Sequence, residues 1–481
     1  MTSRPNVLVL VLDSVRARNT SLHGYAHRTT PNLERLAAEA TVYRFAYAPS
    51  TTSLSSHVSM FTGVHEDAHR LYGTERTLRP GTTIWERLRD EHDYRTGVFT
   101  VNPQFGKPVG LTNGFQTTVL DRPRETKLPF PAATNPADFD VDGPGIVPDH
   151  VARVLASLRQ PAPIRTLYNG LARYRDDRHG RSADIVDAFF EWESRPGPWA
   201  AFVNLMDAHA PYLPGPAHDR WADEDLREVQ AAIGGGHFVR SREVIADGSW
   251  WKPRALRHLY DGAIHQVDAM VGRIFDRLAD RGRLDDTLVI VTADHGEGFG
   301  EHSRLHPGHH VFAHTPGVHE VQTHVPLLVR APDGPRGESV SDPASLTHLP
   351  TAIAGAIPNG FEPDAFCGPD GRVLVSRGTG GDTRYRIDDD FAAGERVALP
   401  ERSYACYERE TEGVLKYCRS GDRSATVLVH SAQASARIAD QDDGKCDAHF
   451  PGPRSGDIVR SNGDGELDRH TRDRLEAFGY L

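Results

Sequence analysis

Two short apolar runs, each followed closely by an aspartate, constrain the fold of this chain more than any other feature. Asn6 to Leu12 (NVLVLVL) and Leu288 to Val291 (LVIV) are β-branched segments of the kind that forms buried parallel strands. Asp13 follows the first run, and Asp294 and His295 stand shortly after the second. Because open α/β sheets place active sites at the carboxyl ends of their strands, the sequence predicts an α/β fold with both aspartates in one site.

Helical and strand-like segments alternate along the first 360 residues, which predicts a large, mostly parallel sheet flanked by helices. Helical spacing is found at Pro31 to Ala40, Trp85 to Glu91, Leu256 to Leu278 and Ser345 to Ile357. Further apolar strands are Thr96 to Val101, Trp199 to Leu205 and Val325 to Val329. Residues 122–144, rich in Pro and Asp, predict a surface excursion, and the glycines 234–236 predict a flexible linker.

Beyond about Gly360 the pattern changes to short alternating strands, at Val373 to Ser376, Val414 to Cys418 and Ala425 to Val429. An amphipathic segment from Asp468 to Phe478 predicts a terminal helix. A chain of 481 residues is long enough for one large and one small domain. We therefore predict a catalytic domain over residues 1–360 and a small α+β subdomain, an antiparallel sheet with a terminal helix, over residues 361–481.

Composition excludes several classes of protein. A net charge of −11 without a basic patch disfavours nucleic acid as a partner. The most apolar run ends at Asp13, too short for a membrane anchor and without the cleavage site of a signal peptide, so we expect a cytoplasmic protein. The four cysteines lack the paired spacing of zinc sites and are interpreted as thiols, with a Cys406–Cys418 bridge as the alternative.

Five motifs, in order along the chain, resemble the signatures of sulfatase-like proteins of the alkaline phosphatase superfamily. They are Asp13-Ser14-Val15-Arg16, Thr30-Pro31-Asn32-Leu33, the Ser53 to Gly63 segment (SLSSHVSMFTG), Met206 to Tyr212 (MDAHAPY) and Asp294 to His302 (DHGEGFGEH). The last residues, Leu475 to Leu481, are similar to the ends of many members. The resemblance covers nearly the whole chain, weakly in residues 122–200 and 213–250.

The resemblance implies that Asp13, Asp294 and His295 hold a divalent cation, with Ser53 as a further ligand and as the nucleophile. Calcium, magnesium, manganese and zinc all suit such ligands. A serine hydroxyl is a poor nucleophile at neutral pH, and coordination to a dication stabilises its alkoxide. Ser53 is chosen over its hydroxyl neighbours because it lies ten residues before Gly63, the interval of the family. The neighbours are expected to make capping hydrogen bonds.

Other residues are assigned to the substrate on the same resemblance. His209 would contact the substrate or protonate the leaving group. His57 stands where sulfatases carry an arginine, and either binds an ester oxygen or orients the nucleophile from behind. Asn102 matches a polar substrate contact, with Lys107 as a nearby cation. In the histidine cluster from 306 to 314, His310 is chosen as the residue that faces the bound oxyanion.

Three departures from the family pattern bear on the chemistry. Ser14 replaces a second metal-binding aspartate, Ser55 and His57 replace the proline and arginine needed for conversion to formylglycine, and the Gly-Lys-Trp-His stretch is missing near Phe99 to Gly106. Asp207 lacks a suitably spaced histidine for a second metal, so one metal is favoured. We therefore favour phosphoester over sulfate ester cleavage by Ser53 through a covalent intermediate.

The alternatives are a true sulfatase with Ser53 converted to formylglycine, a phosphotransferase, and a metal-binding homologue without turnover. The expected substrate is an ester of a small molecule, glycan or lipid. The sequence carries no signal for an oligomeric state.

Overall fold

An eight-stranded sheet forms the centre of the molecule, in the order β13-β2-β12-β8-β1-β7-β5-β6. The computed structural model describes residues 4–120, 181–222, 251–306, 309–314, 317–378, 386–387, 397–398, 402–450 and 458–461. The strands of the sheet are β1 (Asn6–Leu12), β2 (Thr41–Tyr43), β5 (Arg95–Thr100), β6 (Thr117–Val119), β7 (Trp199–Leu205), β8 (Thr287–Thr292), β12 (Leu327–Arg330) and β13 (Glu338–Val340). The predicted excursion at 122–144, the glycines 234–236 and the terminal helix lie outside the described residues.

The pairing of the strands confirms the predicted mostly parallel sheet. β1 lies between β7 and β8 and is parallel to both, with Leu12 opposite Leu205 and Val11 opposite Thr292. β12 runs antiparallel to both of its neighbours, β8 and β2. Because β1, β7 and β8 end at the same edge, the residues that follow them meet there.

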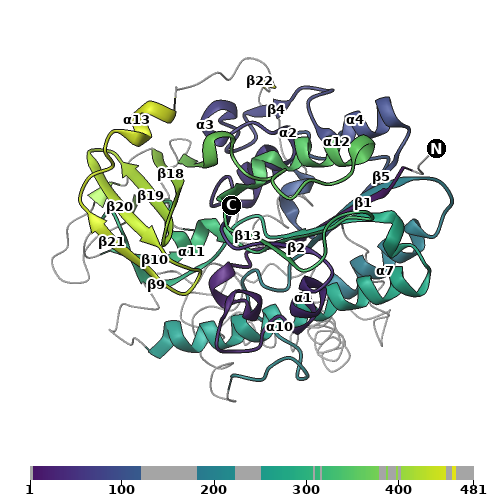
Figure 1. Cartoon of the computed structure of the whole chain (residues 1–481), viewed down its shortest axis with the longest axis horizontal. Coiled ribbons are helices and arrows are strands. Elements are labelled where there is room, and N and C mark those ends of the chain that lie inside the picture. The colour runs from purple at the N-terminus through teal and green to yellow at the C-terminus, as the bar shows by residue number, and fades with distance from the viewer. Residues whose placement is uncertain are drawn as a thin grey trace, which may run out of the picture.

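Helices cover both faces of this sheet (Figure 1). The helices α2 (Ser53–Thr62), α4 (Ile84–His92) and α12 (Leu349–Asn359) lie on one face, and α1 (Pro31–Ala37), α7 (Arg181–Glu193) and α10 (Trp251–Asp280) lie on the other. α10 is the long helix predicted at 256–278, and its apolar side chains are buried against the sheet. Burial of apolar surface on both faces is what makes the central strands continuously hydrophobic.

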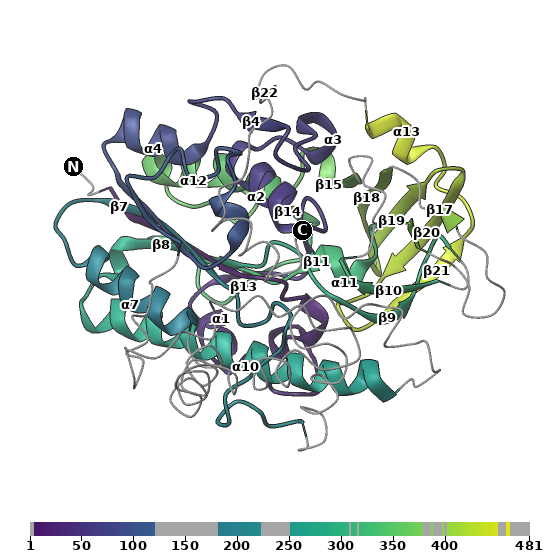
Figure 2. The ribbon, with the colours of Figure 1, turned by 180° about the vertical axis from the view of Figure 1, so that it is seen from behind.

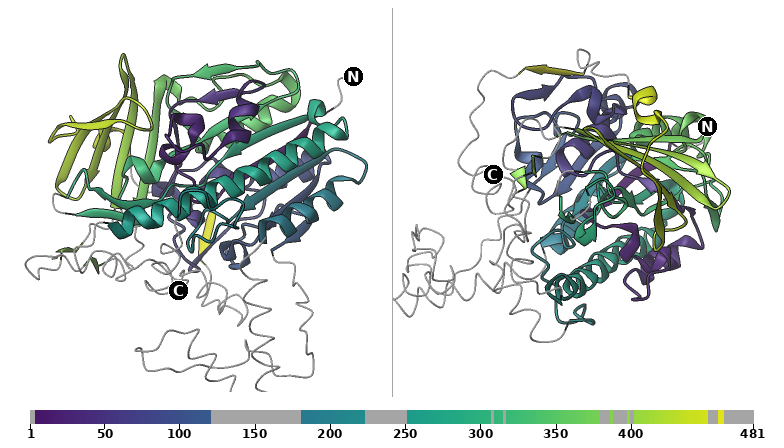
Figure 3. Two further views of the ribbon diagram at one scale, coloured as in Figure 1. Left: turned by 90° about the horizontal axis from the view of Figure 1, so that it is seen from below. Right: turned by 90° about the vertical axis from the view of Figure 1, so that its left-hand side faces the viewer.

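A separate five-stranded antiparallel sheet lies at one end of the molecule (Figure 3). Its strands are β15 (Arg372–Gly378), β18 (Arg402–Glu410), β19 (Gly413–Ser420), β20 (Arg423–Val429) and β21 (Ser435–Ala439), and the short helix α13 (Lys445–His449) packs on it. Its core includes Phe45, Tyr47 and Val318 from the earlier part of the chain, and the rings of Tyr47 and Tyr407 stack 3.7 Å apart. The second sheet is therefore held by apolar contacts against the first part of the chain.

The cysteines are all free thiols, as expected. Cys406 pairs with Tyr417 and Cys418 pairs with Ala405 across β18 and β19. Since successive side chains of a strand point to opposite faces, Cys406 and Cys418 lie on opposite faces and the alternative bridge is not formed. Among the described residues, no helix has the length and apolar character that a membrane span requires.

Candidate active site

Three fully buried ligand groups meet at the carboxyl edge of the central sheet. One oxygen each of Asp13 and Asp294 and one nitrogen of His295 lie within 4.8 Å of one another. Asp13 follows β1 directly, and Asp294 and His295 come two and three residues after the neighbouring strand β8. The structure therefore brings together the residues that the sequence assigned to the metal.

Asp13 is held in place by two asparagine amides. Its Oδ2 accepts hydrogen bonds from Nδ2 of Asn102 at 2.9 Å and of Asn204 at 3.1 Å. Oδ1 of Asn102 accepts from the backbone of Gln104, so both polar atoms of this side chain are engaged with protein. Asn102, predicted as a substrate contact, thus orients Asp13. Asn204 was not singled out from the sequence; its signal is an amide inside the otherwise apolar strand WAAFVNL.

A sharp turn after β1 lets Asp13 face Asp294. Ser14 has a positive φ of 63°, and its backbone N–H donates to Asp294 Oδ1 at 3.1 Å. The hydroxyl of Tyr260, on α10, donates to Ser14 O at 2.7 Å and accepts from Arg16 N at 3.0 Å. A non-glycine residue in this region carries strain, which these hydrogen bonds offset. The serine that departs from the family aspartate therefore serves the site through its backbone and through its hydroxyl, which donates to Asp13 Oδ1 at 3.0 Å.

The second turn, after β8, needs glycine at position 296 because a side chain would not fit there. A Cβ at Gly296 would lie 2.1 Å from the carbonyl oxygen of Val321, a distance that no side chain tolerates. The absence of a side chain lets Gly296 N donate to Gln322 O and Glu297 N donate to Val321 O. The backbone N–H of His295 donates to Asp294 Oδ1 at 3.0 Å, which fixes the two ligands relative to each other.

The electrostatics of this cluster fit a bound cation. Burial, and then the charge of Asp294, raises the pKa of Asp13. Burial also tends to raise the pKa of Asp294. The neighbouring His295 and His57 have the opposite and larger effect, so the pKa of Asp294 is lowered. Oδ2 of Asp294 is buried and makes no hydrogen bond of normal geometry. A divalent cation would compensate two carboxylates that the protein buries this close together.

Ser53 is the first residue of α2 and points at this cluster. Its Oγ lies 3.1 Å from His295 Nε2, and the residue is 1% exposed. A helix N-terminus favours negative charge, which suits a serine alkoxide and a bound oxyanion. The neighbouring hydroxyls are used elsewhere, since Ser55 donates to Leu71 O and Ser56 donates to Ser50 O. Geometry therefore distinguishes Ser53 from its neighbours.

His57 lies one turn further along α2 and is fully buried. Its Nδ1 is 2.6 Å from Ser53 O, and its ring packs edge-on against Phe105 and Phe202. Nδ1 is also 3.9 Å from Asp294 Oδ2. Burial lowers the pKa of His57, so a neutral imidazole is favoured. These contacts fit a residue that orients Ser53 and Asp294 from behind.

Two further histidines, His209 and His314, lie near the ligand cluster. His209 follows β7, and its Nδ1 is 2.7 Å from Ala210 O. The ring of His314 lies 4.4 Å from that of His295 and 5.6 Å from that of His209. Burial, and then the charges of His295 and His209, lowers the pKa of His314 well below its usual value. His209 and His314 therefore face the same space.

The sequence analysis chose His310 as the histidine that faces the bound oxyanion. In the structure, the histidine that lies beside His295 is His314. β10 (His310–Ala313) pairs with β9 (Gly298–His302), and His310 is at the end of β10 farther from His314. There its Nδ1 is 2.8 Å from Gly300 O and its ring packs on His302. Because the pairing of β9 and β10 decides which histidine of the cluster reaches the site, spacing along the chain could not select it.

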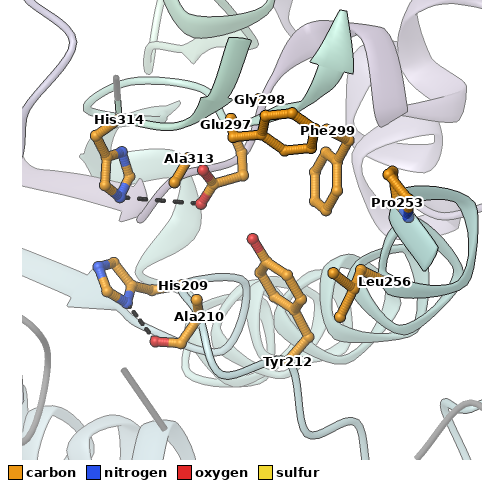
Figure 4. A pocket seen from close by; sticks show the side chains of 11 residues that line it. His209, Ala210, Tyr212, Pro253, Leu256, Glu297, Gly298, Phe299, Ala313 and His314 are labelled. Atoms are coloured by element: carbon orange, nitrogen blue, oxygen red, sulfur yellow. Dashed lines mark hydrogen bonds and ion pairs between the residues drawn. The ribbon is translucent and has the colours of Figure 1, made fainter. Parts of the chain in front are cut away.

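A pocket opens beside His209 and His314 (Figure 4). Its wall is largely apolar and includes Leu256, Phe299 and Phe312, with the Tyr212 ring across from Glu297. Glu297 is fully buried, and its Oε2 is 3.9 Å from His314 Nε2. Burial raises the pKa of Glu297 to about 7. An apolar pocket with a few polar groups is the common form of a small-molecule site.

Asp207 and Lys107 are the remaining residues that the sequence analysis considered for the metal and the substrate. The carboxylate of Asp207 accepts hydrogen bonds from Ser182 and from Gln266 Nε2, and it is not part of the ligand cluster. Lys107 follows the short helix η3 (Pro103–Gly106) and is half-buried.

The sheet, the ligand cluster at its carboxyl edge and the helix-terminal serine define the class: an α/β protein with a buried cluster of ligand groups in a large, mostly parallel sheet. A crystal structure of a protein in the alkaline phosphatase superfamily from Vibrio parahaemolyticus superimposes with a TM-score of 0.52 at 16% identity, covering 94% of this chain and 88% of that one. The phosphonate monoester hydrolase of Agrobacterium radiobacter gives 0.55 at 18% identity, covering 93% and 91%. Likeness at this identity establishes the fold.

The chain belongs to the sulfatase family, whose sequence model matches residues 5–359. Arylsulfatase K of Gallus gallus is 24% identical over 387 residues, which cover 73% of this chain and 63% of that protein. The alignment thus spans less than two thirds of the relative's length. The family confirms the resemblance drawn from the five motifs.

Proposed function

We propose that the protein is a metal-dependent hydrolase of sulfate or phosphate esters that uses Ser53 as its nucleophile. The observation that carries the proposal is the position of Ser53 Oγ, at the N-terminus of α2 and 3.1 Å from His295 Nε2 beside two buried carboxylates. Membership of the sulfatase family supports ester hydrolysis. Within that class we favour phosphoesters.

Asp13, Asp294 and His295, with Ser53, would hold the cation, and a bound divalent ion would stabilise the serine alkoxide and neutralise charge on the attacked group. Asn102 and Asn204 fix the Asp13 carboxylate for this task. The backbone N–H groups of Ser14 and His295 fix Asp294 in the same way. The protein itself therefore sets the positions of the ligands.

In the first step, the Ser53 hydroxyl gives its proton to solvent, and its Oγ forms a bond to phosphorus or sulfur as the bond to the alcohol oxygen breaks. The leaving alcohol takes a proton, and His209 is the candidate donor because it faces the site from the end of β7. In the second step, water attacks the seryl ester, which releases phosphate or sulfate and restores the Ser53 hydroxyl. His314, with a strongly lowered pKa, is neutral and can hydrogen-bond the substrate.

The preference for phosphoesters rests on the serine itself. A formylglycine hydrate can release sulfate by elimination, whereas an unmodified serine leaves a seryl sulfate that only hydrolysis removes. Conversion to formylglycine requires a proline and an arginine at the positions of Ser55 and His57. Both residues instead make hydrogen bonds within the fold. A sulfatase with modified Ser53 is the second candidate, favoured by the arylsulfatase relatives.

The test combines intact mass and peptide mapping across Ser53 with assays on aryl phosphate and aryl sulfate esters, with and without added divalent metals. An unmodified serine with metal-dependent phosphate release supports the proposal. A loss of about two hydrogens at Ser53 with sulfate release supports the sulfatase instead. Full activity in a Ser53→Ala protein would refute Ser53 as the nucleophile.

A further inference from the structure

The pocket beside His209 and His314 is formed by parts of the chain that are distant in sequence. The hairpin of β9 and β10 lies beside α10 (Figure 2), where the rings of Phe299 and Tyr260 are 4.9 Å apart. The segment after β7 supplies Tyr212, whose ring is 5.6 Å from that of Phe299. The pocket therefore has a largely apolar wall directly beside the two histidines of the candidate site.

Glu297 is the acidic residue among the described residues that line this pocket. Its side chain is fully buried, and neither carboxylate oxygen makes a hydrogen bond of normal geometry. Its contact with His314 Nε2 is long, at 3.9 Å, and the Tyr212 hydroxyl faces it across the pocket (Figure 4). The guanidinium of Arg16 pairs with Glu301 at 2.6 Å and donates to the backbone oxygen of Glu297 at 2.8 Å. The Glu297 carboxylate therefore lies at the pocket without a strong partner.

The chemistry of the wall indicates which ligand would supply that partner. A buried carboxylate is costly unless a cation or several donors compensate it, and no lysine or arginine is among the described residues that line the pocket. The rings of Tyr212, Phe299 and Phe312 also line it, and the faces of aromatic rings attract cations. Burial raises the pKa of Glu297, the Tyr212 hydroxyl acts to lower it, and a cation beside the carboxylate would lower it further. The pocket therefore suits an ammonium group.

The position of Glu297 determines where on a substrate this group would lie. Figure 4 shows His209 and His314 at one end of the pocket, Glu297 next to them and Phe299 beyond it. The ring of His314 lies 4.4 Å from that of His295, and its Nε2 lies 3.9 Å from Glu297 Oε2. Since one imidazole lies between the ligand cluster and Glu297, an ester bound at the cluster would reach Glu297 through a short carbon chain of its alcohol.

We propose that Glu297 is a specificity residue that binds an ammonium group on the alcohol part of the substrate. The inference rests on the proposed ester hydrolysis and narrows it to esters of short amino alcohols. Such a substrate would place its reacting group at Ser53, its ammonium group against Glu297 and any apolar substituent against Phe299.

The test compares 2-aminoethyl with propyl phosphate and 3-aminopropyl with butyl phosphate, together with the corresponding sulfates. Within each pair an ammonium group replaces a methyl group of nearly the same size, and the readout is the ratio of the two kcat/KM values. Glu297→Gln keeps the shape of the side chain and removes its charge, so it should lower the ratio of at least one pair about tenfold to a hundredfold, the usual value of a hydrogen bond between charged groups. Comparing the wild type with the variant cancels the effect of the ammonium group on the leaving alcohol itself.

Glu86→Gln is the matched control. Glu86 is also buried, but it caps α4, where its carboxylate accepts hydrogen bonds from the backbone of Gly81 and Thr83, so the ratio should stay at the wild-type value. Glu297→Met replaces Glu297→Gln if the glutamine variant does not fold. Glu297 is not part of the ligand cluster, so its variants should keep the metal-dependent rise in Tm. An unchanged ratio in the Glu297 variant, or loss of its response to metal, would overturn the proposal.

A binding measurement separates this inference from the proposed hydrolysis. If the wild type turns over none of the esters, the proposed function fails, and calorimetry with 3-aminopropylphosphonate and butylphosphonate in saturating divalent metal then decides the role of Glu297. These phosphonates have the chain lengths of 2-aminoethyl and propyl phosphate without the ester bond. Binding of the aminopropyl compound that weakens at least tenfold in Glu297→Gln, with butylphosphonate unaffected, supports the inference. Any other result, including equal binding by the wild type and the variant, contradicts it.

Discussion

Replacing Asp13 with asparagine should change the stability of this protein in opposite directions with and without a metal ion. Burial and the charge of Asp294 raise the pKa of Asp13, so in the cation-free protein the charged form is less favourable folded than unfolded. Asparagine removes that charge and can still accept hydrogen bonds from Asn102 and Asn204. The same change removes a ligand of the proposed cation.

The size of both effects follows from the structure. The ligand atoms lie within 4.8 Å of one another. Two unit charges at that separation repel by about 3.5 kcal/mol at an effective dielectric constant of about 20. His209, His295 and His57 attract Asp13, and proton uptake limits the penalty. The variant should therefore gain only part of this repulsion without metal, about 1–3 kcal/mol. A cation at a hundred times its Kd should stabilise the wild type by about 2.7 kcal/mol.

The assay is thermal unfolding of both proteins in chelator and in saturating Mn²⁺, Zn²⁺, Mg²⁺ or Ca²⁺. For a chain of this length, 1 kcal/mol corresponds to a shift of about 1–2 °C. In chelator the Tm of Asp13→Asn should exceed that of the wild type by about 1–5 °C. The best metal should raise the Tm of the wild type by about 3–5 °C and that of the variant by less than about 1 °C.

Asp207→Asn is the matched control. Asp207 is a half-buried aspartate two residues after β7, and its carboxylate accepts hydrogen bonds from Ser182 and Gln266 outside the ligand cluster. Its response to metal should equal that of the wild type. The reasoning is refuted if Asp13→Asn is less stable than the wild type in chelator and keeps the full metal-dependent shift.

Three further predictions concern the nucleophile, the turn after β1 and the buried acid Glu66 of the short helix α3 (Glu66–His69). Ser53→Ala should lower kcat on the best ester by at least about a thousandfold, while Ser56→Ala, whose hydroxyl donates to a backbone carbonyl, should retain most of the activity in the same assay. Tyr260→Phe should lower the free energy of unfolding by about 2–4 kcal/mol in denaturant titrations, because it removes two buried hydrogen bonds at the Ser14 turn; a loss under about 0.5 kcal/mol would contradict this. Because the folded pKa of Glu66 is raised to about 7, the folded state binds the extra proton. The wild type should therefore lose stability relative to Glu66→Gln as pH rises from about 4.5 to about 7, by at most about 3 kcal/mol, and a pH-independent difference would refute this assignment.

Much of the fold and the ligand cluster could be predicted from local sequence. The runs that end near Asp13 and Asp294 are too uniformly apolar for an exposed strand, and parallel strands end at a common edge. That one rule is enough to predict that Asp13, Asp294 and His295 lie together, as they do. α10 could be predicted from its period of apolar residues, because a helix against a sheet must bury one face.

Only the tertiary structure decided the contacts and strand pairings between segments that are distant in sequence. Asn204 bonds to Asp13 only because β7 pairs with β1. The hydrogen-bond partner of an amide in an apolar strand cannot be predicted from the strand's own sequence. β18 was not predicted as a strand, since half of its residues are polar and its place is set by pairing with β15 and β19.

His314 and the end of β15 show the same division most clearly. The pairing of β9 with β10 turns His314, and not His310, toward His295. The end of β15 lies beside the segment before Ser53 because the backbone of Ser376 donates a hydrogen bond to Pro49 O. The sequence by itself determined the apolar strands of the central sheet, the long helix α10 and the residues at the strand ends, because these follow from local periodicity. Only the tertiary structure decided which side chains surround them, because packing and register are set by contacts between distant parts of the chain.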